Sequence, residues 1–190
     1  MRKVGILGGA FDPPHNGHLL IAETAFKQLD LDEIRFIPTN IPPHKQASLA
    51  TAEERIEMLK LAIETANTSK FIIDSIELNR KGPSYTIDTV TDLLEREPET
   101  KFYFIIGGDM IDYLPHWRRI DELVQCITFV GIPRPSYNGV TKYSVQMLKM
   151  TEIDISSSDI RHKIQTGIAV DEFMPKSVLN FIKENGLYGI

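Results

Sequence analysis

Two histidines near the start of the chain, His15 and His18, directly follow a glycine-rich turn. Residues 8–18 read GGAFDPPHNGH, after a short apolar run and before apolar residues at helical spacing. This pattern predicts a strand, a turn and a helix that begins near Asn16. The two glycines let the backbone come close to a ligand where a Cβ would block it. Because a helix start carries free N–H groups and a positive dipole end, the stretch predicts a phosphate site.

The glycine spacing of this stretch differs from that of the common nucleotide motifs. It is not the dinucleotide fingerprint G-x-G-x-x-G, and it lacks the Gly-Lys-Ser/Thr of a P-loop. His15 and His18 could hold a metal ion, but the pattern lacks the carboxylate and cysteine partners of a usual zinc site. The simplest alternative is a pair of loop histidines beside a turn. The stretch resembles the signature of the H-x-G-H nucleotidyltransferases, which are adenylyl and cytidylyl transferases related to class I aminoacyl-tRNA synthetases.

A proline-rich loop follows the second expected strand and carries further polar candidates. Residues 38–45 read PTNIPPHK, and the prolines favour a stiff, extended loop. Lys45 supplies a positive charge and His44 a hydrogen-bond donor at the carboxyl edge of the expected sheet. A solvated surface loop is the alternative. The loop resembles the corresponding loop of the same superfamily, which implies that Asn40, His44 and Lys45 bind the second substrate.

The segment at 84–89, SYTIDT, leads into another expected helix. Ser84 or Thr86 is a natural N-cap for that helix. Alternatively, the free N–H groups at this helix start receive a carboxylate or phosphate of a substrate. The segment matches the nicotinate-nucleotide adenylyltransferase branch of the superfamily, and this match implies that Ser84, Tyr85 and Thr86 contact the acceptor.

Two glycines and an aspartate follow the expected strand at 101–106. Gly107 and Gly108 permit a close approach of the backbone to a ligand. Asp109 can accept hydrogen bonds from ribose or adenine, or it can be the N-cap of a helix.

The only tryptophan of the chain, Trp117, stands among charged and polar residues. It could offer a half-exposed stacking face to an aromatic ring, or it could simply pack against the core. Tyr113 could wall the same pocket. Arg118 and Arg119 fit an exposed pair on a solvated face, and Arg134, held between prolines after a further expected strand, could face the ligand.

A serine-rich segment near the end of the chain, residues 155–161, reads ISSSDIR. Its serines offer N-caps and extra donors before a helix, and Arg161 lies one turn inside that helix, near enough to help bind phosphates. An ordinary capped helix is the alternative. The segment resembles the I-S-S-T/S-x-I-R element that accompanies H-x-G-H in the same superfamily.

Together these resemblances cover the chain from Gly8 to residues 186–188, and they imply a reaction. AMP would pass from ATP to nicotinate mononucleotide, which would form deamido-NAD and release pyrophosphate. Magnesium is expected with ATP, and no metal ligand is expected from the protein. The implied residues are, for catalysis, His15, His18 and Arg161; for ATP, Gly8, Gly9, Ala10, Phe11, Gly107, Asp109, Ser156, Ser157 and Ser158; and for the acceptor, Asn40, His44, Lys45, Ser84, Tyr85, Thr86, Tyr113, Trp117 and Arg134.

Ala10 departs from the commoner glycine-serine-phenylalanine start of the signature, but a backbone contact does not depend on that side chain. The nucleophile would be a phosphate monoester oxygen, whose second pKa of about 6 leaves it ionised near neutral pH. No general base and no covalent intermediate are then required. The reaction needs two polyanions held in line and positive groups for the leaving pyrophosphate. We expect His18 nearest the α-phosphate, Arg161 at the β- and γ-phosphates, and Lys45 at the acceptor phosphate.

Three other functions remain open on the sequence alone. A related transferase could use another acceptor, such as phosphopantetheine or glycerol phosphate. A nucleotide-binding sensor could keep the fold without catalysis. A tRNA synthetase fragment would lack an anticodon-binding domain and a basic surface here.

The elements that position these residues alternate between strand and helix. Strands are expected at 3–8, 33–38, 70–75, 101–106, 127–132 and 151–155, and helices at 16–29, 51–66, 86–97, 118–125, 142–149, 157–166 and 175–185. This order predicts an α/β, Rossmann-like doubly wound parallel sheet with helices on both faces. We expect one nucleotidyltransferase domain over 1–190, with a C-terminal helical part from about 142 packed on it. Every candidate motif would lie past a strand end, where such sheets bind ligands.

Composition sets the remaining expectations. The chain has 190 residues, 42% of them hydrophobic, and a net charge of −5 without a polybasic run, so we expect no nucleic-acid or membrane partner. The single cysteine, Cys126, falls in an apolar run and is expected as a buried core residue. One cysteine excludes an intrachain disulfide, and no apolar run is long enough for a membrane span. We therefore expect a cytoplasmic protein, which could form a homo-oligomer.

Overall fold

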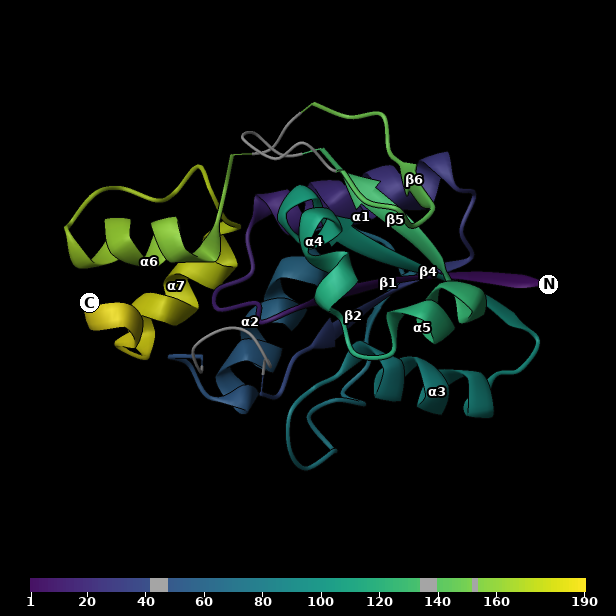
Figure 1. The fold of residues 1–190 in the computed structure, drawn as a ribbon. Helices are drawn as coiled ribbons and strands as arrows, with labels where there is room; N and C mark the ends of the chain where they lie inside the picture. Colours follow the sequence, from purple (N-terminus) through teal and green to yellow (C-terminus); the bar gives the residue numbers. More distant parts are fainter. Residues whose placement is uncertain (42–47, 134–139, 152–153) are drawn as a thin grey trace.

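A parallel sheet forms the centre of the computed structural model, which describes residues 1–41, 48–133, 140–151 and 154–190 (Figure 1). Within these residues its strands are β1 (Arg2–Gly9), β2 (Glu33–Pro38), β3 (Phe71–Ile73), β4 (Thr100–Gly107), β5 (Thr128–Ile132) and β6 (Val145–Met147). All neighbours pair in parallel, in the order β3-β2-β1-β4-β5-β6. The expected doubly wound sheet is thereby confirmed. Its order reverses between β1 and β4, and ligands of such sheets bind at that reversal.

Helices cover both faces of the sheet (Figure 1). On one face, α1 (Asn16–Gln28) and α2 (Ala52–Glu64) pack against side chains such as Leu7 and Phe36. On the other face, α3 (Thr86–Arg96), α4 (Gly108–Tyr113) and α5 (Ile120–Cys126) pack against side chains such as Phe104 and Phe129. Each face therefore has its own core, because the residues of a strand point alternately to the two sides.

Two C-terminal helices, α6 (Ser157–Gln165) and α7 (Lys176–Glu184), pack on α2 through a third apolar cluster that includes Met58 and Ile160. Short 3₁₀ helices complete the described chain, η1 (Leu114–His116) and η2 (Leu187–Gly189). The two chain ends lie on opposite sides of the molecule (Figure 1). No helix in the described part of the chain combines the length and the apolar character needed to cross a membrane.

The local sequence explains where several elements begin. Thr51 caps α2, and its hydroxyl accepts from the N–H of Glu54 at 3.2 Å, while the Glu54 carboxylate accepts from the N–H of Thr51 at 2.7 Å. The two hydrogen bonds together form a capping box. The expected helix at 118–125 begins only at Ile120, because Arg119 has a left-handed φ of 52°. The six-residue helix α4 was not expected from the sequence.

Two predictions near the C-terminal end of the sheet are wrong. The helix expected at 142–149 is replaced by β6, which pairs with β5 through the Phe129–Val145 and Gly131–Met147 partners. At the strand expected over 151–155, the described residues 151, 154 and 155 are not in a strand. A Cβ at Gly131 would lie 2.4 Å from Sδ of Met147. The absence of a side chain at residue 131 therefore leaves room for β6 beside β5. The C-terminal helical part therefore begins at Ser157 rather than near residue 142.

Cys126 is exposed, and its expected burial is wrong. The apolar run that contains it is split between two elements, because α5 ends at Cys126 and β5 begins at Thr128. Burial therefore follows the helical period up to Cys126 and the strand period from Thr128, and the last residue of the helix faces solvent.

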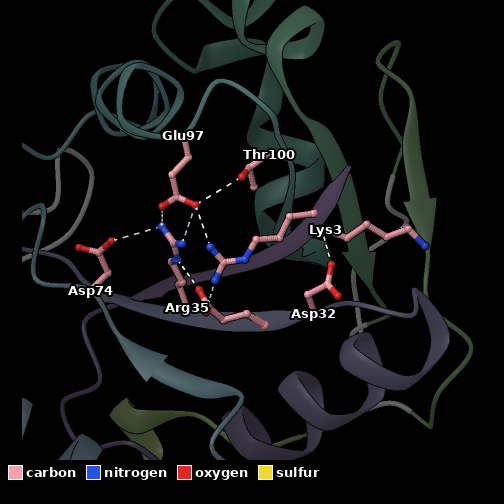
Figure 2. Close-up of polar contacts among 8 residues, drawn as sticks. Lys3, Asp32, Arg35, Asp74, Glu97 and Thr100 are labelled. Atoms are coloured by element: carbon pink, nitrogen blue, oxygen red, sulfur yellow. Dashed lines mark hydrogen bonds and ion pairs between the residues drawn. The ribbon is translucent and has the colours of Figure 1, made fainter.

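An ion-pair network around the buried Arg35 lies toward the amino-terminal ends of the strands (Figure 2). Arg35 of β2 donates from Nε to Glu33 at 2.6 Å and forms an ion pair from Nη1 to Oε1 of Glu97 at 2.6 Å. Its guanidinium also lies 5.9 Å from the centre of the Phe102 ring. Glu97 is the C-cap of α3, so the network fixes the end of that helix that is remote from Thr86.

Candidate active site

The turn after β1, residues 10–15, is called the signature turn below. Residues from other parts of the chain hold it in place. Phe11 is buried and has a left-handed φ of 51°. Arg55 of α2, itself buried, donates from Nη1 to the carbonyls of Ala10 at 2.7 Å and Thr39 at 2.9 Å. Burial lowers the pKa of Arg55, and the nearby Asp12 partly offsets this effect. Arg55 therefore ties the turn after β1 to the turn after β2.

Asp12 is the second anchor of this turn and is only 2% exposed. Its carboxylate accepts from the N–H of Leu49 at 2.8 Å and from the Tyr188 hydroxyl at 2.6 Å. Burial, together with the hydrogen bond to Asp12, raises the pKa of Tyr188. The carbonyl of Asp12 accepts from Nη1 of Arg161 at 2.7 Å. One residue thus joins the signature turn to two C-terminal segments.

His15 and His18 stand at the start of α1, as expected from the sequence. His15 is buried and is the N-cap, and His18 is half-buried in the first turn. Their rings are stacked with centroids 3.7 Å apart, and the Phe11 ring meets His18 edge-on at 4.9 Å. Nδ1 of His18 accepts from the N–H of His15 at 3.2 Å. This bond assigns the proton of a neutral His18 ring to Nε2, which makes Nε2 a donor.

The start of α6 docks on the signature turn, although the two segments lie far apart in sequence. The Ser157 hydroxyl donates to the carbonyl of Pro13 at 2.9 Å across 144 residues. Arg161 reaches the same turn and also donates from Nη2 to Oγ of Ser158 at 3.3 Å. Ser156 is the N-cap of α6, as the sequence predicted. Two helix starts, two histidines and an arginine are thereby gathered beside one glycine-rich turn.

The turn after β2, the neighbour of β1 in the sheet, contacts the start of α3. The N–H of Asn40 donates to Oγ of Ser84 at 3.2 Å, and the N–H of Ser84 donates to the carbonyl of Ile41 at 2.9 Å. Ser84 is buried by these contacts. The N-cap of α3 is Tyr85 rather than Ser84 or Thr86, and the Tyr85 side chain does not cap the helix. The expected N-cap is therefore wrong, whereas Asn40 and Ser84, both assigned to the acceptor from the sequence, lie in contact.

Two aromatic side chains flank η1, with Tyr113 as its N-cap and Trp117 as its C-cap. Trp117 is half-buried and meets the rings of Phe104 at 5.9 Å and Phe129 at 5.7 Å, both edge-on. Tyr113 stacks on His116 with centroids 4.8 Å apart. Trp117 thus packs on the sheet and keeps an exposed portion, which leaves both sequence-based interpretations standing.

The two arginines after Trp117 differ in their contacts. Arg119 is bound to Glu122 by hydrogen bonds of 3.0 and 2.6 Å, which agrees with an exposed, solvated residue. The Arg118 guanidinium lies 4.6 Å from the centre of the Tyr85 ring. Arg118 therefore borders the start of α3, a placement that the sequence did not reveal.

Four further predicted residues lie at or just past the ends of β1 and β4. Gly8 and Gly9 end β1, Gly107 is the N-cap of α4, and Asp109 lies in the first turn of that helix. His44, Lys45 and Arg134 lie outside the described residues.

Among the described residues, no group of three or more His, Cys, Asp or Glu side chains could hold a metal ion. The carboxylate of Asp12 already accepts from Leu49, Ala50 and Tyr188. The described residues around Asp12 therefore do not provide a set of ligands for a resident metal ion. Mg²⁺ keeps several waters and binds readily through the phosphates of a ligand, so it needs few ligands from a protein.

Comparisons with known proteins agree with this geometry. The family model described as Cytidylyltransferase-like matches residues 6–163. A protein of Listeria monocytogenes named "Probable nicotinate-nucleotide adenylyltransferase" is 52% identical over 98% of this chain and 97% of its own length. A protein of Oceanobacillus iheyensis with the same name is 47% identical over 100% of this chain and 98% of its own length. The fold matches that of Plasmodium falciparum nicotinic acid mononucleotide adenylyltransferase complexed with NaAD, with a TM-score of 0.84, 21% identity and coverage of 99% of this chain and 98% of that chain.

Proposed function

Because this chain belongs to the nicotinate-nucleotide adenylyltransferase family, within the cytidylyltransferase-like proteins, we propose that it transfers AMP from ATP to nicotinate mononucleotide. The products are deamido-NAD and pyrophosphate. The observation that carries this function is the docking of Arg161 and Ser157 on the signature turn, since it assembles phosphate-binding groups from both ends of the chain.

The reaction is a displacement at the α-phosphorus of ATP. An oxygen of the acceptor phosphate forms the new P–O bond, the bond to the bridging oxygen of the β-phosphate breaks, and that oxygen leaves with pyrophosphate. The nucleophile is ionised near neutral pH, since its second pKa is about 6. The protein therefore has to align two anions and stabilise the charge that moves onto the leaving group.

We assign the ATP side to the signature turn and α6. Nε2 of His18 donates to an oxygen of the α-phosphate, and His15 supports that ring by stacking on it at 3.7 Å. Arg161 and the N–H groups at the start of α6 bind the β- and γ-phosphates. Backbone groups at 8–11 approach the phosphates. Gly107, the last residue of β4, and Asp109, in the first turn of α4, hold the adenosine.

We assign the acceptor side to the start of α3 and the aromatic residues beside it. The nicotinate carboxylate is received by N–H groups at 84–86, where the helix dipole is positive. Trp117 offers a ring face, with Tyr113 and Tyr85 beside it, and Asn40 lines the pocket from the turn after β2. His44, Lys45 and Arg134 complete the proposed acceptor set.

The proposal is tested by mixing the protein with MgATP and each of several acceptors: nicotinate mononucleotide, nicotinamide mononucleotide, phosphopantetheine and glycerol phosphate. We expect pyrophosphate release and a dinucleotide with the mass of deamido-NAD in the first mixture. Binding of ATP without pyrophosphate release from any mixture would instead identify a nucleotide sensor.

A further inference from the structure

Glu77 is a buried carboxyl that the proposed mechanism does not use. It lies between β3 and α3 and is 7% exposed. Oε1 of Glu77 accepts from the hydroxyl of Thr89 at 2.9 Å, and Thr89 is fully buried. Burial raises the pKa of Glu77, and interactions with Thr89 and Ser84 offset this effect in part. Since a buried carboxyl is costly to keep, its partners indicate what it holds in place.

The residues around Glu77 contact both walls of the proposed acceptor pocket. Thr89 lies one turn inside α3, just after the residues assigned to the nicotinate carboxylate. Ser84, just before that helix, accepts from the N–H of Asn40 in the turn after β2. Glu77 therefore holds a helix whose start contacts that turn.

Arg80 closes the same network. Nη2 of Arg80 donates to Oγ1 of Thr89 at 2.9 Å, and Nη1 donates to Oδ2 of Asp92 at 2.9 Å. The carbonyl of Arg80 accepts from Nδ2 of Asn40 at 2.9 Å. The Thr89 hydroxyl thus accepts a hydrogen bond from Arg80 and donates one to Glu77, so it acts both as an acceptor and as a donor.

We propose that Glu77 is a positioning residue that, through the Thr89 hydroxyl, fixes the start of α3 against the turn after β2 and thereby sets the affinity for the acceptor. This inference rests on the proposed function, because it takes the acceptor site from it. The ATP side has anchors of its own in Asp12 and α6. Loss of the Glu77–Thr89 bond lowers the fraction of protein whose acceptor pocket is formed, and the apparent acceptor affinity falls by that fraction.

Two pairs of variants separate the hydrogen bond from simple loss of packing. Thr89→Val keeps the shape and removes the hydroxyl, whereas Thr89→Ser keeps the hydroxyl. Glu77→Ala removes the acceptor oxygen, whereas Glu77→Gln keeps one. If the competent form falls to about one tenth, Thr89→Val and Glu77→Ala raise the KM for nicotinate mononucleotide about tenfold. We expect the KM for ATP within about twofold of the wild-type value, and near wild-type kinetics from Thr89→Ser and Glu77→Gln, because the hydrogen bond is kept.

Glu97→Gln is the matched control, since Glu97 fixes the opposite end of the same helix through Arg35 (Figure 2). It should lower the melting temperature without changing the acceptor KM. An unchanged acceptor KM in Thr89→Val, or an equal rise in both KM values, would overturn the inference. If Glu77→Ala does not fold, the Thr89 pair decides. A wild-type protein without turnover of nicotinate mononucleotide would instead refute the proposed function, and the inference would fall with it.

Discussion

The orientation of His18 is fixed by its own backbone neighbourhood. Its Nδ1 accepts the N–H of His15, and its ring lies between those of His15 and Phe11. A side chain held in this way presents Nε2 as a donor with little entropy left to lose. This rigidity is why a small change at residue 18 should affect the rate more than the binding.

We predict that His18→Ala lowers kcat by about 10²–10³, the scale for the loss of one preorganised donor, with a smaller effect on both KM values. Steady-state kinetics with both substrates varied measures this. His162→Ala is the matched control, since His162 lies exposed on α6. A His18→Ala protein with the wild-type kcat would remove His18 from the chemistry.

Arg161 has two structural contacts, with Asp12 and Ser158, besides its proposed phosphates. Lysine keeps the charge of residue 161 but not the planar fork that makes several bonds at once. We expect Arg161→Lys to raise the KM for ATP by at least about tenfold, the lower end for hydrogen bonds to charged groups, and to slow turnover. Acceptor binding should change little. Unaltered ATP kinetics would mean that α6 is an ordinary capped helix.

At the scale of residues, motif patterns located the histidines, the serines and Arg161 but missed their supports. Arg55, Glu77 and Tyr188 stand in unremarkable sequence, and their partners lie 12 to 176 residues away. A single sequence contains no signal for such pairs, because each bond depends on the folded path between them. The one available hint is a polar residue at a buried position of a helix, as with Arg55 in α2.

At the scale of elements, the period of the apolar residues predicted secondary structure and burial correctly where burial is uniform. It predicted burial wrongly where one apolar run is divided between two elements, as at Cys126. The continuous apolar run of β4 and the capping box of α2 give the same answer from local and long-range interactions. The segment at 142–149 does not, because β6 exists only through pairing with β5 beside Gly131. The docking of α6 on the signature turn was implied by the resemblance, whereas no local pattern predicted it.

The segment around η1 carries a prediction of its own, because it presents Trp117 between the core and the start of α3. Trp117→Ala should raise the KM for nicotinate mononucleotide about two- to tenfold, which is the range for an aromatic contact beyond its area burial. The KM for ATP should stay nearly unchanged. An unchanged acceptor KM together with a lower melting temperature would assign Trp117 to packing against Phe104 and Phe129 alone.

At the scale of the whole molecule, the groups proposed for function and the ion-pair network around Arg35 lie toward opposite ends of the strands. Phosphate and acceptor groups gather past the carboxyl ends of the strands, while the Arg35 network lies toward their amino-terminal ends (Figure 2). This division follows from the strand order, which brings the turns after β1 and β4 side by side. The parallel sheet was inferred from element alternation, whereas its strand order and the network were not, since the partners of Arg35 in β2 include residues just past the ends of β3 and α3.

This network should make stability depend on pH at the acid end. The hydrogen bond from Arg35 lowers the pKa of Glu97 below its ordinary value. Because the carboxyl binds protons more weakly in the folded state, its contribution is present above the unfolded pKa of about 4.3 and is lost as the pH falls through the lower, folded value. We predict that the difference in unfolding free energy between wild type and Glu97→Gln shrinks as the pH falls below about 4.3. Urea titrations at several pH values measure it, and a difference independent of pH would contradict the role of Glu97.

The choice of acceptor depends on the whole site, since it combines the start of α3, the aromatic face and the phosphate side. A helix start favours a carboxylate over a neutral carboxamide. The decisive measurement is therefore the ratio of kcat/KM for nicotinate mononucleotide and nicotinamide mononucleotide, with MgATP saturating. We predict a strong preference for nicotinate mononucleotide, with deamido-NAD as the product. Equal values for the two acceptors, or a preference for the carboxamide, would contradict the account.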